Sequence, residues 1–185
     1  MEYNLSPEDL KKMQPYLKPL VLKKGAIFIE SGKKNQKIGI LQSGLMISSY
    51  ISDKGKEEVS RIYSKINGYT IVSNHESFYY NVSSTENIKA IEETHLMVLS
   101  KNDLEEGLRI HPELDKLVQG ISETSYINAI ERIKEFQSYS AKERIKKHYT
   151  KHPQLFSKIS KQHYASFLGI NRNDFTKFLN EIIKE

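Results

Sequence analysis

The sequence predicts an α+β protein in which an antiparallel β-roll is followed by a long helix and a C-terminal helix-turn-helix. Three observations carry this prediction. Short apolar and β-branched runs separated by turn signals occupy residues 20–100. From Asn102 onward, the hydrophobic pattern takes a helical period. Near the C-terminus, a small residue, a glycine and two spaced phenylalanines occur in the order that two crossing helices need.

Composition limits the kinds of protein that this chain can be. Its 185 residues are 38% hydrophobic and 28% charged, which is typical of a globular domain with a small additional unit. No apolar run approaches the ~18 residues of a membrane span, and the first ten residues lack the features of a signal peptide. We therefore expect a cytoplasmic protein. The absence of cysteine excludes disulfides, iron–sulfur clusters and cysteine-ligated zinc.

Positive charge is concentrated in the last quarter of the chain. Residues 141–185 hold ten Lys and Arg against four Asp and Glu, whereas residues 1–140 hold eighteen against nineteen. A basic C-terminal segment of this kind suggests a polyanionic partner. A solvated helical surface would have the same composition, so charge alone leaves both interpretations open.

The N-terminal part is predicted to be a short helix followed by strands. Ser6 and Pro7 provide a helix start, and Pro15 and Pro19 stop that helix. Strands of four to eight residues at regular spacing predict an antiparallel, jelly-roll-like roll. The expected strands are LVLKK (20–24), AIFIE (26–30), KIGILQ (37–42), LMISSYIS (45–52), EVSRIY (58–63), NIKAIE (87–92) and HLMVLS (95–100).

Residues 73–84 fit neither a strand nor a helix period, so we expect a loop with one helical turn. Phe78, Tyr79 and Tyr80 lie in this segment. Their aromatic side chains could line a ligand cavity or fill the core, and filling the core is the commoner use of such residues.

A long helix is predicted from Pro112 to Gln137, with apolar residues in two stripes. One stripe contains Leu114, Leu117, Val118 and Ile121, and the other contains Tyr126, Ile130 and Ile133. Because the two stripes lie on different faces, the helix needs two partners. We expect the roll to be one of them and a second copy of the helix to be the other, with Tyr126, Ile130 and Ile133 at a dimer seam.

The next helix is expected to start at residue 141, since Ser140 and Glu143 form a capping box, and to end at Pro153. The expected units are therefore a β-roll sensor domain at 1–111, a dimerisation helix at 112–137 and a helix-turn-helix domain at 140–185.

The stretch from Ser160 to Leu179 carries the helix-turn-helix pattern. Ser160 can cap a short helix through Leu168, Ala165 allows a close crossing, and Gly169 suits the left-handed turn. Ile170 then fills the corner, and Asn171, Phe175 and Phe178 suit the start and the inner face of a second helix. An ordinary αα-hairpin with a glycine turn would show much the same pattern.

Exposed polar residues of this motif are the candidate DNA contacts. Cations and helix starts suit phosphate, whereas forked or long side chains suit base edges in the major groove. Asp174 would repel phosphate, so we expect it to point elsewhere. The candidate DNA-binding residues are Lys161, Gln162, Asn171, Arg172, Asn173, Thr176 and Lys177.

In this order of elements, with GAIFIESG and LQSGLMISSYISDKGKE in the roll, the chain resembles the Crp/Fnr family of transcription regulators. The resemblance implies a cyclic-nucleotide-binding-like roll and a homodimer on a two-fold-symmetric DNA operator, with recognition residues at Arg172, Asn173 and Lys177. Where this chain has Asn173, the family often has glutamate, and little chain remains for a C-terminal wing. RNA polymerase and an unidentified small-molecule effector are further candidate partners.

The family's cyclic-nucleotide contacts are not matched. A Gly-Glu pair for the ribose would fall at residues 67–70, which read Asn-Gly-Tyr-Thr, and an arginine for the phosphate would fall at residues 82–87. Neither segment has the required residue, no arginine occurs between Arg61 and Arg109, and Glu86 would oppose a phosphate. We therefore expect no cyclic-AMP binding.

Other kinds of site have weaker support. His148 and His152 could bind a metal from one helix face, but surface histidines are common and no carboxylate motif accompanies them. No cofactor and no enzymatic activity are expected, since no nucleophile-elbow pattern occurs. The alternative to a DNA-binding regulator is a ligand-binding or scaffolding module whose helical C-terminus contacts another protein.

Overall fold

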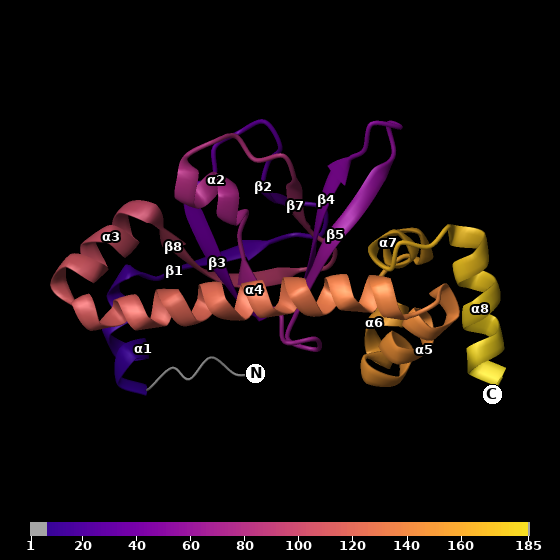
Figure 1. The fold of residues 1–185 in the computed structure, drawn as a ribbon. Coiled ribbons are helices and arrows are strands. Elements are labelled where there is room, and N and C mark those ends of the chain that lie inside the picture. Colours follow the sequence, from indigo (N-terminus) through magenta and orange to yellow (C-terminus); the bar gives the residue numbers. More distant parts are fainter. Residues whose placement is uncertain (1–6, 185) are drawn as a thin grey trace.

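A computed structural model describes residues 7–184 and contains the roll, the long helix and the C-terminal helices expected from the sequence (Figure 1). The predicted cap residue Ser6 lies outside the described residues. The strands are β1 (Lys18–Leu22), β2 (Ile27–Ile29), β3 (Lys37–Ser43), β4 (Leu45–Ile51), β5 (Glu57–Ser64), β6 (Ile71–Val72), β7 (Asn87–Ala90) and β8 (Thr94–Ser100). The helices are α1 (Pro7–Met13), α2 (His75–Tyr80), α3 (Lys101–Ile110), α4 (Asp115–Ser138), α5 (Ala141–Lys151), α6 (Pro153–Lys158), α7 (Lys161–Phe167) and α8 (Arg172–Lys184).

The strands form two four-stranded antiparallel sheets, ordered β1-β8-β3-β6 and β2-β7-β4-β5. Alternate apolar residues from both sheets, including Phe28, Leu41, Met46 and Ile88, fill the space between them. The fold class predicted from the sequence is thus confirmed. The two-residue strand β6 was not predicted, and α2 is a six-residue helix where one helical turn was expected.

The turn between β3 and β4 requires glycine. Gly44 has a φ of 98°, and a Cβ on it would lie 2.6 Å from the carbonyl oxygen of Glu93. Since the obstructing atom belongs to the backbone, no side chain could move aside. This glycine therefore fixes where the chain passes from one sheet to the other.

The long helix begins later than predicted. Pro112–Leu114 form a 3₁₀ turn, and α4 itself runs from Asp115 to Ser138. At its N-terminal end, Leu114 is buried and Val118 packs against the same cluster, which includes Phe78 and Leu104. The first stripe thus contacts the roll and α3, as expected, although the side chain of Leu117 is not among the described ones. Figure 1 shows α4 running along the roll and ending beside α5–α8.

The second stripe of α4 is open to solvent in the single chain. Tyr126 is 67% exposed and Ile133 is 52% exposed, while Ile130 is half-buried. An apolar stripe of Tyr126, Ile130 and Ile133 is costly in water unless something covers it.

The C-terminal helices share a core with the roll. Leu45, Ile47, Val59 and Ile62 from β4 and β5 belong to one buried cluster with side chains of α5–α8, among them Tyr164 and Phe175. The helix-turn-helix region is therefore packed directly against one sheet. Among the described residues, no helix is long and apolar enough to cross a membrane.

Candidate nucleic-acid interface

Helices α7 and α8 are joined by a tight turn whose residues behave as the sequence predicted. The hydroxyl oxygen of Ser160 accepts a hydrogen bond from the backbone N–H of His163 and so caps α7. Gly169 adopts a φ of 66°, and its N–H donates to the carbonyl oxygen of Ser166 at 2.9 Å. Ile170 donates to the carbonyl oxygen of Ala165 at 2.9 Å and is buried. These bonds fix the crossing of the two helices.

The start of α8 is also capped as predicted. The side-chain oxygen of Asn171 accepts from the backbone N–H of Asp174 at 2.9 Å. The amide nitrogen of Asn171 donates to the carboxylate of Asp174, so Asp174 is held at the cap. Phe175 is buried and Phe178 is half-buried on the inner face of α8.

The candidate DNA-contacting side chains lie on the outside of the two helices. Arg172 and Asn173 are exposed in the first turn of α8, and Lys177 is exposed one turn further on. Thr176 is half-buried, and its hydroxyl donates to the carbonyl oxygen of Arg172 at 2.9 Å. The remaining members of the set, Lys161, Gln162 and Asn171, are exposed at the two helix starts. The fold thus gathers all seven at one end of the molecule.

Two arginines that the sequence analysis did not single out hold α7 in place. Arg132 of α4 donates to the carbonyl oxygen of Phe167, and Arg144 of α5 donates to that of Leu168 at 3.1 Å. The last carbonyl groups of a helix have no partner within the helix, so these two guanidiniums satisfy them. The sequence signal that could have identified Arg132 is its position between Ile130 and Ile133 of the apolar second stripe.

The side of α7 that faces the roll is tied to β5. The hydroxyl group of Ser166 accepts from the backbone N–H of Val59 at 2.8 Å and donates to a carboxylate oxygen of Glu58 at 2.6 Å. The hydrogen bond from Ser166 is the main cause that lowers the pKa of Glu58. His163 lies 3.5 Å from Glu57. These contacts leave the N-terminus of α7 and the outer face of α8 uncovered.

Ionisable side chains also lie close together where α4 meets α5. His148 lies 3.3 Å from Glu135, and Lys147 lies 3.6 Å from the same carboxylate. A carboxylate therefore does accompany His148, although it comes from α4 and not from a motif around the histidines. Within residues 7–184, no group of three or more His, Cys, Asp or Glu side chains could hold a metal ion.

Polar side chains make internal contacts in and near the two segments, 67–70 and 82–87, that the sequence analysis compared with cyclic-nucleotide contacts. The side chain of Asn67 donates to the carbonyl oxygen of Ile62 and accepts from the N–H of Tyr69. Glu86 accepts from the hydroxyl of Ser48 at 2.8 Å. Lys89, the nearest cation after the loop, lies 2.7 Å from Glu57.

The three aromatic residues of α2 differ in burial. Phe78 is buried in the core, while Tyr79 and Tyr80 are 42% and 77% exposed. The interpretation that these aromatic side chains fill the core is therefore confirmed for Phe78 alone.

Comparison with known proteins gives a likeness in structure. No family model and no curated protein matches the chain in sequence. Among solved structures, FixK2 from Bradyrhizobium japonicum is 11% identical, with a TM-score of 0.75 over 91% of this chain and 85% of that one. CLP from Xanthomonas campestris, a c-di-GMP-responsive global regulator, is 12% identical, with a TM-score of 0.74 over 97% and 92%.

A third solved structure, from Eubacterium rectale, is assigned to the Crp/Fnr family of transcriptional regulators. It is 16% identical to this chain, with a TM-score of 0.70 over 96% of this chain and 83% of that one. Each of the three structures aligns with more than nine tenths of this chain. The resemblance expected from the sequence is therefore confirmed, and the chain has the fold of the Crp/Fnr regulators.

Proposed function

We propose that this chain is a DNA-binding transcription regulator that binds an inverted-repeat operator as a homodimer. The observation that carries the proposal is the exposed start of α8, where Arg172 and Asn173 stand beside the capped helix terminus. Side chains in the first turn of a recognition helix reach base edges in the major groove. The positive charge of residues 141–185 supports a polyanionic partner.

Gel-shift measurements at roughly 50 and 200 mM salt would test DNA binding, because release of counterions makes the affinity fall steeply with salt. We expect a steep fall for the wild-type chain, and a smaller one for Lys177→Ala. Lys116→Ala, an exposed change near the far end of α4, serves as the matched control and should behave like the wild type. Absence of salt-sensitive binding would favour the protein-interaction alternative.

The dimer proposal rests on the uncovered stripe of α4. Two copies of α4 lying side by side would bury Tyr126, Ile130 and Ile133 against their symmetry mates. Sedimentation should give a dimer at micromolar concentration, and Tyr126→Asp should give a folded monomer. Tyr80→Asp places the same charge at a more exposed site on α2 and should leave the dimer intact. A stable wild-type monomer would contradict this part of the proposal.

We further propose that the roll does not bind cyclic AMP. Burying a cyclic phosphate requires a fixed cation or aligned N–H groups. The segment at 82–87 contains no cation, Glu86 in it would oppose a phosphate, and Lys89 is paired with Glu57. Titration calorimetry should detect no binding, and a micromolar dissociation constant would refute the claim.

These assignments give each part of the chain a separate role. We assign residues 1–111 to a sensor domain, residues 112–137 to dimerisation and residues 140–185 to DNA binding. RNA polymerase is a candidate partner of the DNA-bound dimer, and the chain acts as a regulator without enzymatic activity.

A further inference from the structure

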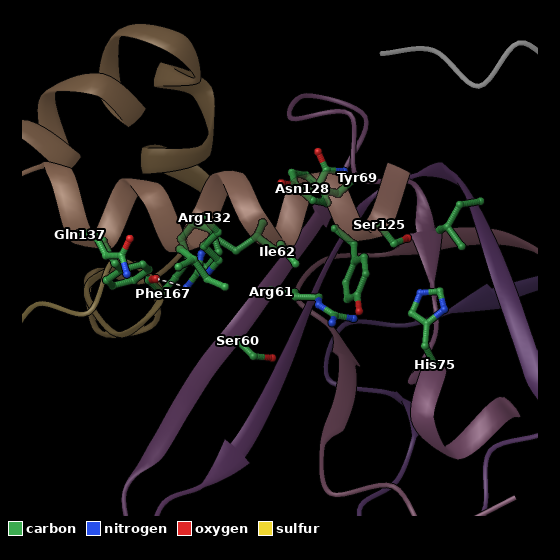
Figure 2. A pocket seen from close by; sticks show the side chains of 15 residues that line it. Ser60, Arg61, Ile62, Tyr69, His75, Ser125, Asn128, Arg132, Gln137 and Phe167 are labelled. Carbon is green, nitrogen blue, oxygen red and sulfur yellow. Dashed lines mark hydrogen bonds between the residues drawn. The ribbon is translucent and has the colours of Figure 1, made fainter. Parts of the chain in front are cut away.

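The helix-turn-helix contacts the roll through α7 in addition to being joined to it by the chain. The chain passes from α4 to α5 through Tyr139 and Ser140. Helix α7 lies against β5, which is the edge strand of its sheet (Figure 1). Beside this contact, residues of β5, α4 and α7 line a cavity of about 480 Å³, across which α4 and β5 face each other (Figure 2). Helix α7 therefore bridges two elements that lie on opposite sides of a cavity.

Ser166 makes the central contact between α7 and β5. Its buried hydroxyl group accepts from the backbone N–H of Val59 at 2.8 Å and donates to the carboxylate of Glu58 at 2.6 Å. A serine hydroxyl has one donor and two acceptor sites, so both kinds are in use here. Alanine at this position would leave the N–H of Val59 without this partner. The contact thus depends on a single hydroxyl group that matches a donor and an acceptor on successive residues of β5.

Strand β5 is irregular at the point where it receives α7. Ser49 of β4 pairs with Val59 and Ser48 pairs with Arg61, so Ser60 is an extra residue in β5. A bulge of this kind bends an edge strand and changes the direction of the neighbouring groups. The N–H that Ser166 binds therefore belongs to a residue next to a local bend.

Ion pairs with complementary charge flank the contact. His163 of α7 lies 3.5 Å from Glu57 of β5, and Lys158 of α6 lies 2.9 Å from Glu92, which follows β7. In both pairs, the carboxylate belongs to the roll and the basic group belongs to the C-terminal helices. Partly exposed pairs contribute little to stability, but complementary charges fix the orientation in which two surfaces meet.

The other end of α7 is bound to α4 and α5. Arg132 of α4 donates to the carbonyl oxygen of Phe167, a bond that Figure 2 shows as a dashed line. Arg144 of α5 donates to the carbonyl oxygen of Leu168 at 3.1 Å and to that of Tyr139 at 2.7 Å. Helix α7 cannot rotate without breaking contacts with three elements. Since the turn after α7 is fixed by its own hydrogen bonds, the direction of α8 is fixed as well.

We propose that the docking of α7 on β5 determines which spacing of DNA half-sites the dimer accepts, with Ser166 as the positioning residue. The two recognition helices of such a dimer must lie about one turn of DNA, roughly 34 Å, apart. A reader held only by the chain at 139–140 could follow half-sites at several spacings. A docked reader must break its contacts or deform the DNA at any other spacing. The spacing effect rests on the proposed function, whereas the docking does not.

Hydrogen exchange measured by NMR on the intact chain tests the docking without DNA. The N–H of Val59 should exchange slowly in the wild type, because α7 covers it. Ser166→Ala should exchange at this position about tenfold faster. Ser157→Ala is the matched control, since it removes an exposed hydroxyl group that bonds within α6, and it should match the wild type. Rapid exchange of Val59 in the wild type would overturn the proposal.

Operators with altered spacing test the effect on recognition. An operator is first selected from random DNA by the wild-type chain, and base pairs are then inserted or removed between its half-sites. We expect wild-type affinity to fall by about tenfold for a change of about two base pairs, and the affinity of Ser166→Ala to fall by about threefold or less. Base preference within each half-site should stay the same for both. Equal falls for the two chains, or a change in base preference, would contradict the proposal.

Glu58→Ala tests the same contact from the roll, and it leaves α7 and α8 unchanged. It should relax the spacing requirement in the same direction as Ser166→Ala, so the test stands even if circular dichroism shows that Ser166→Ala does not fold. Glu30→Ala removes an exposed carboxylate elsewhere on the roll and should keep the wild-type spacing requirement. A wild-type chain that protects the N–H of Val59 but binds no DNA would refute the proposed function and leave the docking intact.

Discussion

The outer face of α8 and the cavity that residues of β5 and α4 line both present arginine, but in opposite surroundings. Arg172 stands in water on the first turn of a helix. Arg132 is packed over two aromatic rings and already supports a backbone carbonyl group. A solvated cation suits a long polyanion, whose many charges add up, whereas a partly desolvated cation interacts more strongly with each charge near it.

The comparison shows how the two regions are joined. Phe136 lines the cavity and also lies against Gly169, where a Cβ would approach the ring to 2.5 Å. Arg132 lines the cavity and holds the end of α7. The turn that orients α8 therefore touches two side chains of the cavity wall.

The largest expected effect comes from adding a side chain at Gly169, where the turn meets the ring of Phe136. Gly169→Ala must keep a φ of 66° with a side chain and must also displace the ring of Phe136. We expect a loss of about 2–3 kcal/mol in the free energy of unfolding, which corresponds to roughly 4–12 °C in Tm. Gly25→Ala is the matched control, because Gly25 has a φ of 86° with open space around it. Equal losses for the two variants would show that Phe136 does not constrain the turn.

The next effect concerns the solvated arginine. Arg172→Ala should remove a base contact that contributes about 1–3 kcal/mol and relax specificity at one position of each half-site. Gel shifts on a panel of operators with single base changes would measure this, with Arg109→Ala on α3 as an exposed control. A uniform loss across all operators would instead assign Arg172 to phosphate.

A smaller effect concerns pH in the cavity. Burial and the charge of Arg61 lower the pKa of His75 below its ordinary value of 6.5. The folded state therefore favours neutral His75, so its stabilising contribution is complete above pH 6.5 and is lost as the pH falls towards the lowered pKa. Denaturation of His75→Gln should show a shallower loss of stability between pH 7 and pH 5 than the wild type. Identical profiles would contradict this assignment.

The smallest expected effect is that of Lys161→Ala at the start of α7. Lys161 is exposed and faces outward, so it should contact phosphate and read no base. We expect the slope of log affinity against log salt to decrease by about one, with weaker binding to all operators alike. A change in sequence preference would place Lys161 against a base edge.

Features set by neighbouring residues were predictable from the sequence. Ser140 and Glu143 form both hydrogen bonds of the capping box, and Gly169 adopts the left-handed conformation, because each depends on residues within one turn. The cavity could not be predicted in this way. Arg61 and Arg132 meet only because β5 faces α4, and no local pattern relates them. Strand β6 was missed because its two residues are too few to show a period.

The bond between Ser166 and Val59 has a consequence for handling the sensor part alone. Strand β5 is at the edge of its sheet, and α7 supplies a hydroxyl group to an N–H that would otherwise stay open. Uncovered edge strands pair with other chains and lead to aggregation. A fragment cut after the long helix would expose this edge, together with the apolar side chains of Val59 and Ile62. The C-terminal helices therefore also cover β5 and prevent the roll from self-associating through this edge strand.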